Sequence, residues 1–211
     1  MPIVDFPPVD QASAEGVVGV GGDLHPQSLL LAYSRGIFPW PHGKLLAWFC
    51  PDPRAVLDFD RLHVGNSLAR ARRRLSYAVS VDRAFKEVIQ ACAAAPRPDQ
   101  DDTWITSAVI AAYTRFHSLG HAHSLEIWEG PELIGGIYGV RVGAVFSAES
   151  MFYRRPYASK LAVLELCDYL RHCGLAFLDV QVMTPHMERL GAHHIPRTEF
   201  QRRLANSVTA P

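Results

Sequence analysis

Apolar residues recur along this chain at two spacings, and each spacing predicts a different kind of element. Apolar positions three or four residues apart predict helices over 26–35, 67–74, 83–95, 107–119 and 159–173, with a further short helix from Pro185. Alternation of apolar and polar residues predicts strands over 77–81, 124–128, 133–140, 145–152 and 177–182. Because glycine-containing turns separate three consecutive strands, the middle of the chain is typical of an antiparallel meander. The pattern by itself indicates an α+β fold.

The segment 21–56 is rich in glycine, proline and aromatic residues. Gly36 follows the first predicted helix, where a glycine favours helix termination. The next four residues, IFPW at 37–40, match neither a helix nor a regular strand. Large aromatic side chains on a proline-stiffened loop are costly to leave in water, so we expect them to cover a core or line a pocket. Residues 52–60 connect this compact part to the rest, which predicts a small N-terminal domain over 1–60 and a larger domain over 61–211.

Composition narrows the class of protein. With 211 residues, 48% hydrophobic and 20% charged, the chain resembles an ordinary soluble globular protein. No apolar run approaches the roughly 20 residues that span a bilayer, and residues 1–10 lack the pattern of a secretory signal. The four cysteines show no CxxC spacing, and no HExxH motif occurs among the ten histidines. We therefore expect a cytoplasmic protein with reduced thiols, no metal site and no membrane partner.

Charge is distributed unevenly although the formal net charge is zero. Acids outnumber bases in residues 1–60, whereas residues 61–80 contain five arginines and no acid. Four of these arginines belong to the predicted helix 67–74: Arg70, Arg72, Arg73 and Arg74. Such a cluster within a neutral protein either contacts the phosphates of a nucleic acid or forms a solvated helix face that the acidic N-terminal part balances.

Three polar residues interrupt strands that are otherwise apolar. Asp179 and Gln181 lie two positions apart in the predicted strand 177–182, so they share one face of it. Since an unpaired buried carboxylate is costly, these two must satisfy each other, the backbone or a ligand. Glu149 interrupts the strand 145–152 and either pairs with a buried base or awaits a cationic ligand. The bases nearest to it in sequence are Arg141, Arg154 and Arg155.

A series of short motifs in a fixed order carries a family resemblance. The motifs are GGDL at 21–24, RGIFPW at 35–40, WFCPDPRAV at 48–56, TWIT at 103–106, GHAHS at 120–124, AESMF at 148–152, ASK at 158–160 and LDVQV at 178–182. In this order they resemble the leucyl/phenylalanyl-tRNA–protein transferases, and the resemblance covers about residues 17–204. Cys50 stands where this family usually has serine.

The resemblance implies a small N-terminal domain followed by an acetyltransferase-like (GNAT-type) α/β domain with a mostly antiparallel sheet. It implies transfer of Leu or Phe, with Met as a further candidate, from aminoacyl-tRNA to the α-amino group of proteins that begin with Arg or Lys. Such transfer marks the acceptor proteins for degradation. The resemblance requires no cofactor, and we expect a monomer. It also favours RNA contact as the role of the arginine cluster.

The resemblance further implies roles for individual residues. Asp179 and Gln181 belong to the reaction centre, where Gln181 contacts the attacking amine and Asp179 orients Gln181 or accepts a proton through it. Glu149 receives the positively charged N-terminal residue of the acceptor protein. The 3′ end of the aminoacyl-tRNA and its side chain are expected against residues that could also be plain core: Trp40, Trp104, Ile137, Phe146 and Leu166.

Two other functions stay open from the residues alone. An acyl-CoA-dependent N-acetyltransferase of the same fold would place a glycine-containing phosphate-binding loop before a helix. The corresponding segment here, YRRPYAS at 153–159, contains no glycine. A non-catalytic tRNA-binding protein would not need Asp179, Gln181 and Glu149 together on interior strands. Both observations favour the aminoacyltransferase.

Overall fold

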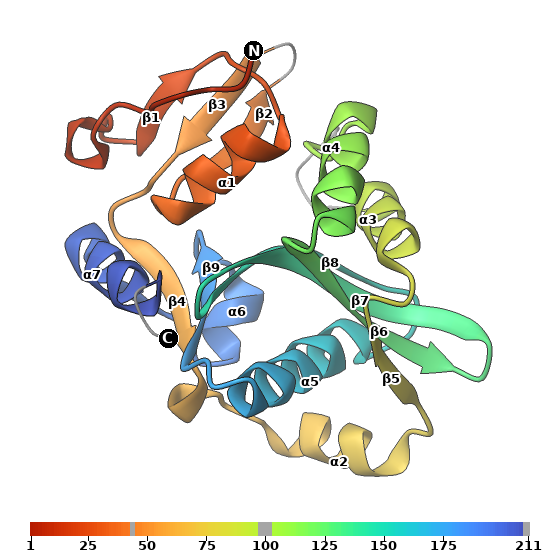
Figure 1. Cartoon of the computed structure of the whole chain (residues 1–211). Coiled ribbons are helices and arrows are strands. Elements are labelled where there is room, and N and C mark those ends of the chain that lie inside the picture. The colour runs from red at the N-terminus through yellow and green to blue at the C-terminus, as the bar shows by residue number, and fades with distance from the viewer. Residues whose placement is uncertain (43–44, 97–102, 209–211) are drawn as a thin grey trace.

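A three-stranded sheet and a helix form the N-terminal unit of the computed structural model, which describes residues 1–42, 45–96 and 103–208 (Figure 1). The sheet has the order β1-β3-β2, with β1 at Val17–Val20, β2 at Phe38–His42 and β3 at Leu45–Phe49. Helix α1 (Pro26–Ser34) begins as expected, with a proline in its first turn, and packs against β2. Short 3₁₀ helices lie at Val9–Gln11 (η1) and Phe59–Arg61 (η2).

The strand β2 includes residues 38–40 of the IFPW segment, which the sequence pattern did not assign to a strand. It contains Pro39 and Pro41, which cannot donate backbone hydrogen bonds. Since β2 is an edge strand of its sheet, paired only with β3 among the described strands, the missing donors are tolerated there. The edge position therefore explains why a proline-rich segment forms a strand.

The second sheet has seven strands in the order β10-β4-β9-β8-β7-β6-β5. In chain order these are β4 (Arg54–Asp58), β5 (Ala78–Val81), β6 (Ala122–Glu129), β7 (Glu132–Val142), β8 (Val145–Tyr153), β9 (Phe177–Gln181) and β10 (His193–Ile195). Neighbours are antiparallel except β8 and β9, which are parallel. The predicted meander is β6-β7-β8, so the mostly antiparallel sheet agrees with the sequence pattern.

The strand β4 shifts the division between the two units. The boundary expected at residue 60 falls after β4, but β4 pairs with β9 and β10 in the larger sheet. The chain leaves the first sheet after Phe49 and enters the second at Arg54. Because a strand belongs to the sheet that satisfies its backbone hydrogen bonds, β4 is part of the larger unit.

Helices cover both faces of the large sheet (Figure 1). On one face, α3 (Phe85–Ala94) and α4 (Ser107–Ser118) contact the meander, and their core continues into the N-terminal unit. On the other, α5 (Ala158–His172) contacts the same strands, and α2 (Asn66–Arg74) packs on α5. Alternate residues of β7 enter the two cores, Tyr138 on the α3 side and Ile137 on the α5 side.

Two further helices follow β9. They are α6 (Pro185–Arg189), which the pattern predicted, and α7 (Arg197–Val208), which it did not. Helix α7 lies beside β4 (Figure 1), and its buried side chains, Phe200 and Leu204, pack with Val56 of that strand. No helix in the described part of the chain is long and apolar enough to cross a membrane.

A bulge in β7 gives a first test of the packing. At Gly139, next to this bulge, a β-carbon would lie 2.3 Å from the carbonyl oxygen of Ser147 and 2.3 Å from a ring carbon of Phe146. Gly139→Ala should therefore lower the free energy of unfolding by about 1–3 kcal/mol, as overpacking does. Gly19→Ala, next to a bulge in β1 with no heavy atom within 4 Å, should change it by less than about 0.5 kcal/mol. Urea denaturation of both variants measures this, and equal costs would contradict the packing described.

Candidate active site

The strands β8 and β9 form a short parallel ladder with a cavity beyond its end. In the described structure the ladder joins Phe146 to Leu178 and Ser147 to Asp179. A cavity of about 170 Å³ lies beyond these pairs. Its walls come from 148–151 of β8 and 180–182 around the end of β9, together with Phe38, Pro39, Trp40, Trp104, Ile137, Thr184 and Met187. Both units of the fold thus contribute to one cavity.

Glu149 and Gln181 meet at the wall of this cavity. Gln181 Nε2 donates a hydrogen bond to Glu149 Oε1 at 2.6 Å, and the Tyr33 hydroxyl also hydrogen-bonds to the carboxyl. The Tyr33 hydroxyl is bonded in turn to that of Tyr113, so α1 and α4 both support the site. Burial raises the pKa of Glu149 to about 7. A cation that entered the cavity would favour the ionised form of this carboxyl.

The three arginines considered as partners of Glu149 have other partners. Arg141 donates to the carbonyl of Gly143, Arg154 donates to the carbonyl of Leu133, and Arg155 pairs with Glu132 at 2.9 Å. The side chains that hydrogen-bond to Glu149 in the described structure are neutral. Of the two alternatives drawn from the sequence, pairing with one of these bases is therefore wrong.

Asp179 is the anchor of a buried ion pair that the sequence pattern did not reveal. Arg54 Nε and Nη2 donate to its two oxygens, both at 2.8 Å, and the Ser147 hydroxyl donates at 2.7 Å. The backbone N–H of Gln181 provides a fourth hydrogen bond at 3.0 Å. Four donors match the roughly four lone-pair sites of a carboxylate. Asp179 is therefore saturated, and a role in which it accepts a proton from the reaction is disfavoured.

The guanidinium of Arg54 is itself enclosed by aromatic rings. Its central carbon lies 5.0 Å from the ring centroid of Phe38 and 4.4 Å from that of Phe200. The Arg54 side chain is only 1% exposed, so removing this ion pair from water costs a large desolvation free energy. Cation–π contacts of a desolvated arginine contribute about 2 kcal/mol, which offsets part of that cost.

Gln181 leaves the strand conformation at the end of β9. Its φ of 67° lies in the left-handed region, which residues other than glycine adopt only when their surroundings hold them there. The bond from its N–H to Asp179 is one such restraint. The two side chains were expected to share a strand face. Instead, Asp179 is fully buried under Arg54, while Gln181 lines the cavity.

The residues expected to bind the aminoacyl end divide into two groups. Trp40, Trp104 and Ile137 line the cavity. Phe146 and Leu166 do not; they are 2% and 3% exposed and belong to the core between the sheet and α5. Because neither residue lines this cavity, contact between these two and the aminoacyl end stays a prediction.

The arginine cluster of α2 also divides. Arg70, Arg73 and Arg74 are exposed. Arg72 instead pairs with Glu165 at 2.9 Å and with Asp168 at 2.6 Å on α5. Arg72 therefore fastens α2 to α5, and the phosphate-contact prediction applies to the other three.

Residues that sequence reasoning missed include Arg54, Ser147, Tyr33 and Tyr113. Arg54 offered one signal, since a charge at the start of the apolar run RAVL requires a partner. The tyrosines resembled ordinary core positions of helices. Among the described residues, no group of three or more His, Cys, Asp or Glu side chains is placed to hold a metal ion.

Two family models match the chain. The leucyl/phenylalanyl-tRNA protein transferase N-terminal domain matches residues 22–52, and the leucyl/phenylalanyl-tRNA protein transferase model matches residues 56–205. The chain belongs to this family. A leucyl/phenylalanyl-tRNA–protein transferase from Anaeromyxobacter sp. (strain Fw109-5) is 50% identical over 210 residues, covering 99% of this chain and 89% of that relative. Another, from Stutzerimonas stutzeri (strain A1501), is 46% identical and covers 99% of this chain and 93% of that relative.

The likeness to solved structures is more distant. A ribosomal-protein-alanine N-acetyltransferase from Brucella melitensis biovar Abortus 2308 shares 14% sequence identity with this chain, at a TM-score of 0.36. The match covers 65% of this chain and 93% of the acetyltransferase. A likeness this remote supports no conclusion about function, so the cavity and the family membership have to support it.

The raised pKa of Glu149 makes the stability of the fold depend on pH. An acid with a folded pKa above its unfolded value contributes stability below the unfolded pKa, here 4.5, and loses it as the pH rises through about 7. Glu149→Gln removes this ionisation and keeps the shape. Its melting temperature should match wild type near pH 5 and exceed it near pH 8, by about 2–4 °C per kcal/mol gained. Thermal melts, with the exposed Glu188→Gln as control, measure the difference. A variant no more stable than wild type near pH 8 would contradict the burial of this carboxyl.

Proposed function

We propose that this chain transfers Leu or Phe from aminoacyl-tRNA to the α-amino group of proteins whose first residue is Arg or Lys, and so marks them for degradation. The observation that carries the proposal is the cavity beyond the β8–β9 ladder, where Glu149, Gln181 and two tryptophans meet in a member of this family. Met is a further candidate donor. The proposal includes a cytoplasmic monomer, no cofactor, and a GNAT-type domain that follows a small N-terminal domain.

The dimensions of the cavity suit the donor's side chain. An engineered apolar cavity of about 150 Å³ in another protein holds benzene. The cavity here, about 170 Å³ and bordered by Ile137, Met151 and Met187, has room for an isobutyl or benzyl group. Trp40 and Trp104 then offer ring faces for the terminal adenine, and each stacked base contributes roughly 1–3 kcal/mol.

The polar side chains of the cavity suit the acceptor. The Glu149 carboxyl has neutral hydrogen-bond partners, so a guanidinium or ammonium side chain that enters would supply the missing counter-charge. Because Gln181 Nε2 donates to Glu149, its amide oxygen is left to accept a hydrogen bond from the attacking amine. The α-amino group of a peptide has a pKa near 8, so a fraction of it is already neutral at neutral pH.

The reaction then needs orientation more than a strong base. The amine nitrogen attacks the ester carbonyl carbon, the C–N bond forms, and the C–O bond to the ribose breaks. One amine proton ends on the ribose oxygen, which leaves as a hydroxyl, and no redox step is involved. Holding the amine and ester in line can lower the barrier by several kcal/mol. Gln181 orients the amine, and the cavity orients the ester.

A transfer assay tests the proposed function. Wild-type protein with Leu-tRNA should add labelled Leu to an Arg-terminated peptide, and acetyl-CoA should give no acetylated peptide. Glu149→Gln should raise the KM for the Arg-terminated peptide and narrow the preference over an Ala-terminated one by a few kcal/mol at most, as expected for losing a buried charge contact. Binding of tRNA without transfer would instead indicate a non-catalytic tRNA-binding protein. Unchanged preference in Glu149→Gln would assign acceptor selection to another residue.

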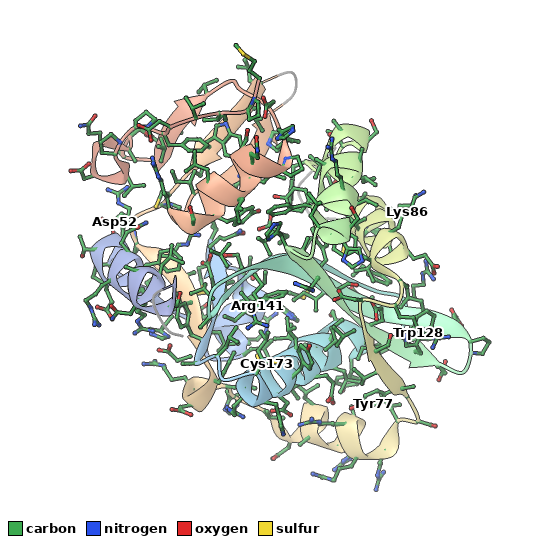
Figure 2. All side chains as sticks on the ribbon, in the orientation of Figure 1. Asp52, Tyr77, Lys86, Trp128, Arg141 and Cys173 are labelled. Carbon is green, nitrogen blue, oxygen red and sulfur yellow. The ribbon has the colours of Figure 1, made fainter. Side chains whose placement is uncertain are left out.

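The exposed arginines of α2 generate a separate prediction. Arg70→Glu with Arg74→Glu should weaken binding of every tRNA isoacceptor alike and reduce the salt dependence of binding by about one per lost phosphate contact. Lys86→Glu with Arg202→Glu makes the same change of charge elsewhere. Figure 2 shows Lys86 on α3, away from α2, so this control should leave the salt dependence unchanged. Filter binding over a range of salt measures both, and equal slopes would show the cluster to be a solvated face.

A further inference from the structure

Arg54 lies behind the proposed active site. Its side chain is 1% exposed and is not among the residues that line the cavity. It nevertheless connects to the cavity in two steps, since Arg54 holds the Asp179 carboxylate and Asp179 Oδ1 accepts from the backbone N–H of Gln181. In the proposed function, Gln181 is the residue that orients the attacking amine.

Helix α7 extends this connection to the C-terminal part of the chain. The ring of Phe200 covers one side of the Arg54 guanidinium, and the ring of Phe38 lies within 5.0 Å of it. Phe38 lines the cavity next to Trp40. A guanidinium held by rings from β2 and α7 can neither rotate nor withdraw without disturbing both.

Polar contacts fasten α7 to the N-terminal unit as well. Gln201 Nε2 donates to the carbonyl of Arg35 at 2.8 Å, and Arg197 Nη1 donates to the carbonyl of Cys50 at 2.9 Å. The backbone N–H of Arg197 donates to Asp52, which Figure 2 shows beside the start of α7. These contacts fix α7, and with it Phe200, relative to the N-terminal part of the chain.

We propose that Arg54 and Phe200 are positioning residues for aminoacyl transfer, acting through Asp179 on Gln181. This inference rests on the proposed function. Asp179 acts here as an anchor: the fork of Arg54 sets the orientation of its carboxylate, and that carboxylate holds Gln181 at a φ of 67°. The side-chain amide of Gln181 then reaches Glu149 at 2.6 Å. If the two-pronged contact between Arg54 and Asp179 is loosened, Gln181 relaxes toward an ordinary strand conformation. Its side-chain amide then moves away from the attacking amine.

The test compares three variants in steady-state transfer from Phe-tRNA to an Arg-terminated peptide. Arg54→Lys keeps the charge but loses the two-pronged geometry. Phe200→Leu keeps every charge and removes only the ring. Leu204→Ala, one turn further along α7 in the same buried cluster, removes apolar volume without touching the described ion pair. It is the control for loss of stability alone.

A misplacement of about 1 Å can reduce a rate by up to about 100-fold. Arg54→Lys should lower kcat by about 10- to 100-fold, and Phe200→Leu several-fold, with the KM for Phe-tRNA little changed. Leu204→Ala should keep the wild-type kcat at a temperature where it is folded. Normal rates in Arg54→Lys and Phe200→Leu, or an equal loss in Leu204→Ala, would overturn the proposal.

A spectroscopic measurement separates this proposal from the proposed function. The backbone ¹H–¹⁵N resonance of Gln181 reports its hydrogen bond to the Asp179 carboxylate. It should move in Arg54→Lys and in Phe200→Leu and stay in place in Leu204→Ala. A resonance that does not move in the first two variants would overturn the positioning role, even with an active wild-type enzyme. An inactive wild type would instead refute the proposed function, whatever this resonance does.

Discussion

The ion pair between Arg54 and Asp179 is the interaction on which the site depends. Both side chains are almost completely excluded from water, and a buried charge without its partner would destabilise the fold by about 3–5 kcal/mol. The pair is tolerated because Arg54 donates twice, Ser147 and a backbone N–H complete the shell, and two aromatic rings cover the cation. Its members come from β4 and β9, neighbouring strands that are 125 residues apart in sequence.

The position of the pair explains the position of the cavity. Ser147 and Asp179 form the last register pair of the β8–β9 ladder. Beyond this pair, β8 and β9 are no longer paired with each other through their backbones. Instead, the side chains of Glu149 on β8 and Gln181 on β9 hydrogen-bond to each other. A saturated carboxylate thus ends the ladder, and two polar side chains with spare hydrogen-bonding capacity begin the site. Because their surroundings differ, the two carboxyl groups have different roles. Asp179 holds Gln181 in place, whereas Glu149 is able to respond to a cation.

Parts of this arrangement could be predicted from the sequence. The meander follows from alternation and turns, α1 and α5 follow from helical spacing, and Glu149 and Gln181 were recognisable as polar residues in apolar strands. Arg54 was not identified as the partner of Asp179, because pairing between distant strands leaves no local signal. Helix α7 escaped notice because, among its side chains that the structure describes, only Phe200 and Leu204 are buried, too few for a clear period. Phe146 and Leu166 were apolar residues that the pattern could not assign between cavity and core.

We propose that the space beyond the β8–β9 ladder holds the amino acid that is transferred. A crystal structure with a phenylalanyl-adenosine analogue, its ester replaced by an amide, tests this most directly. We expect the phenyl ring in the cavity beside Ile137 and Met151. The adenine should lie against Trp40 or Trp104, and the carbonyl group should lie within reach of the Gln181 amide. A phenyl ring bound anywhere outside this cavity would contradict this placement.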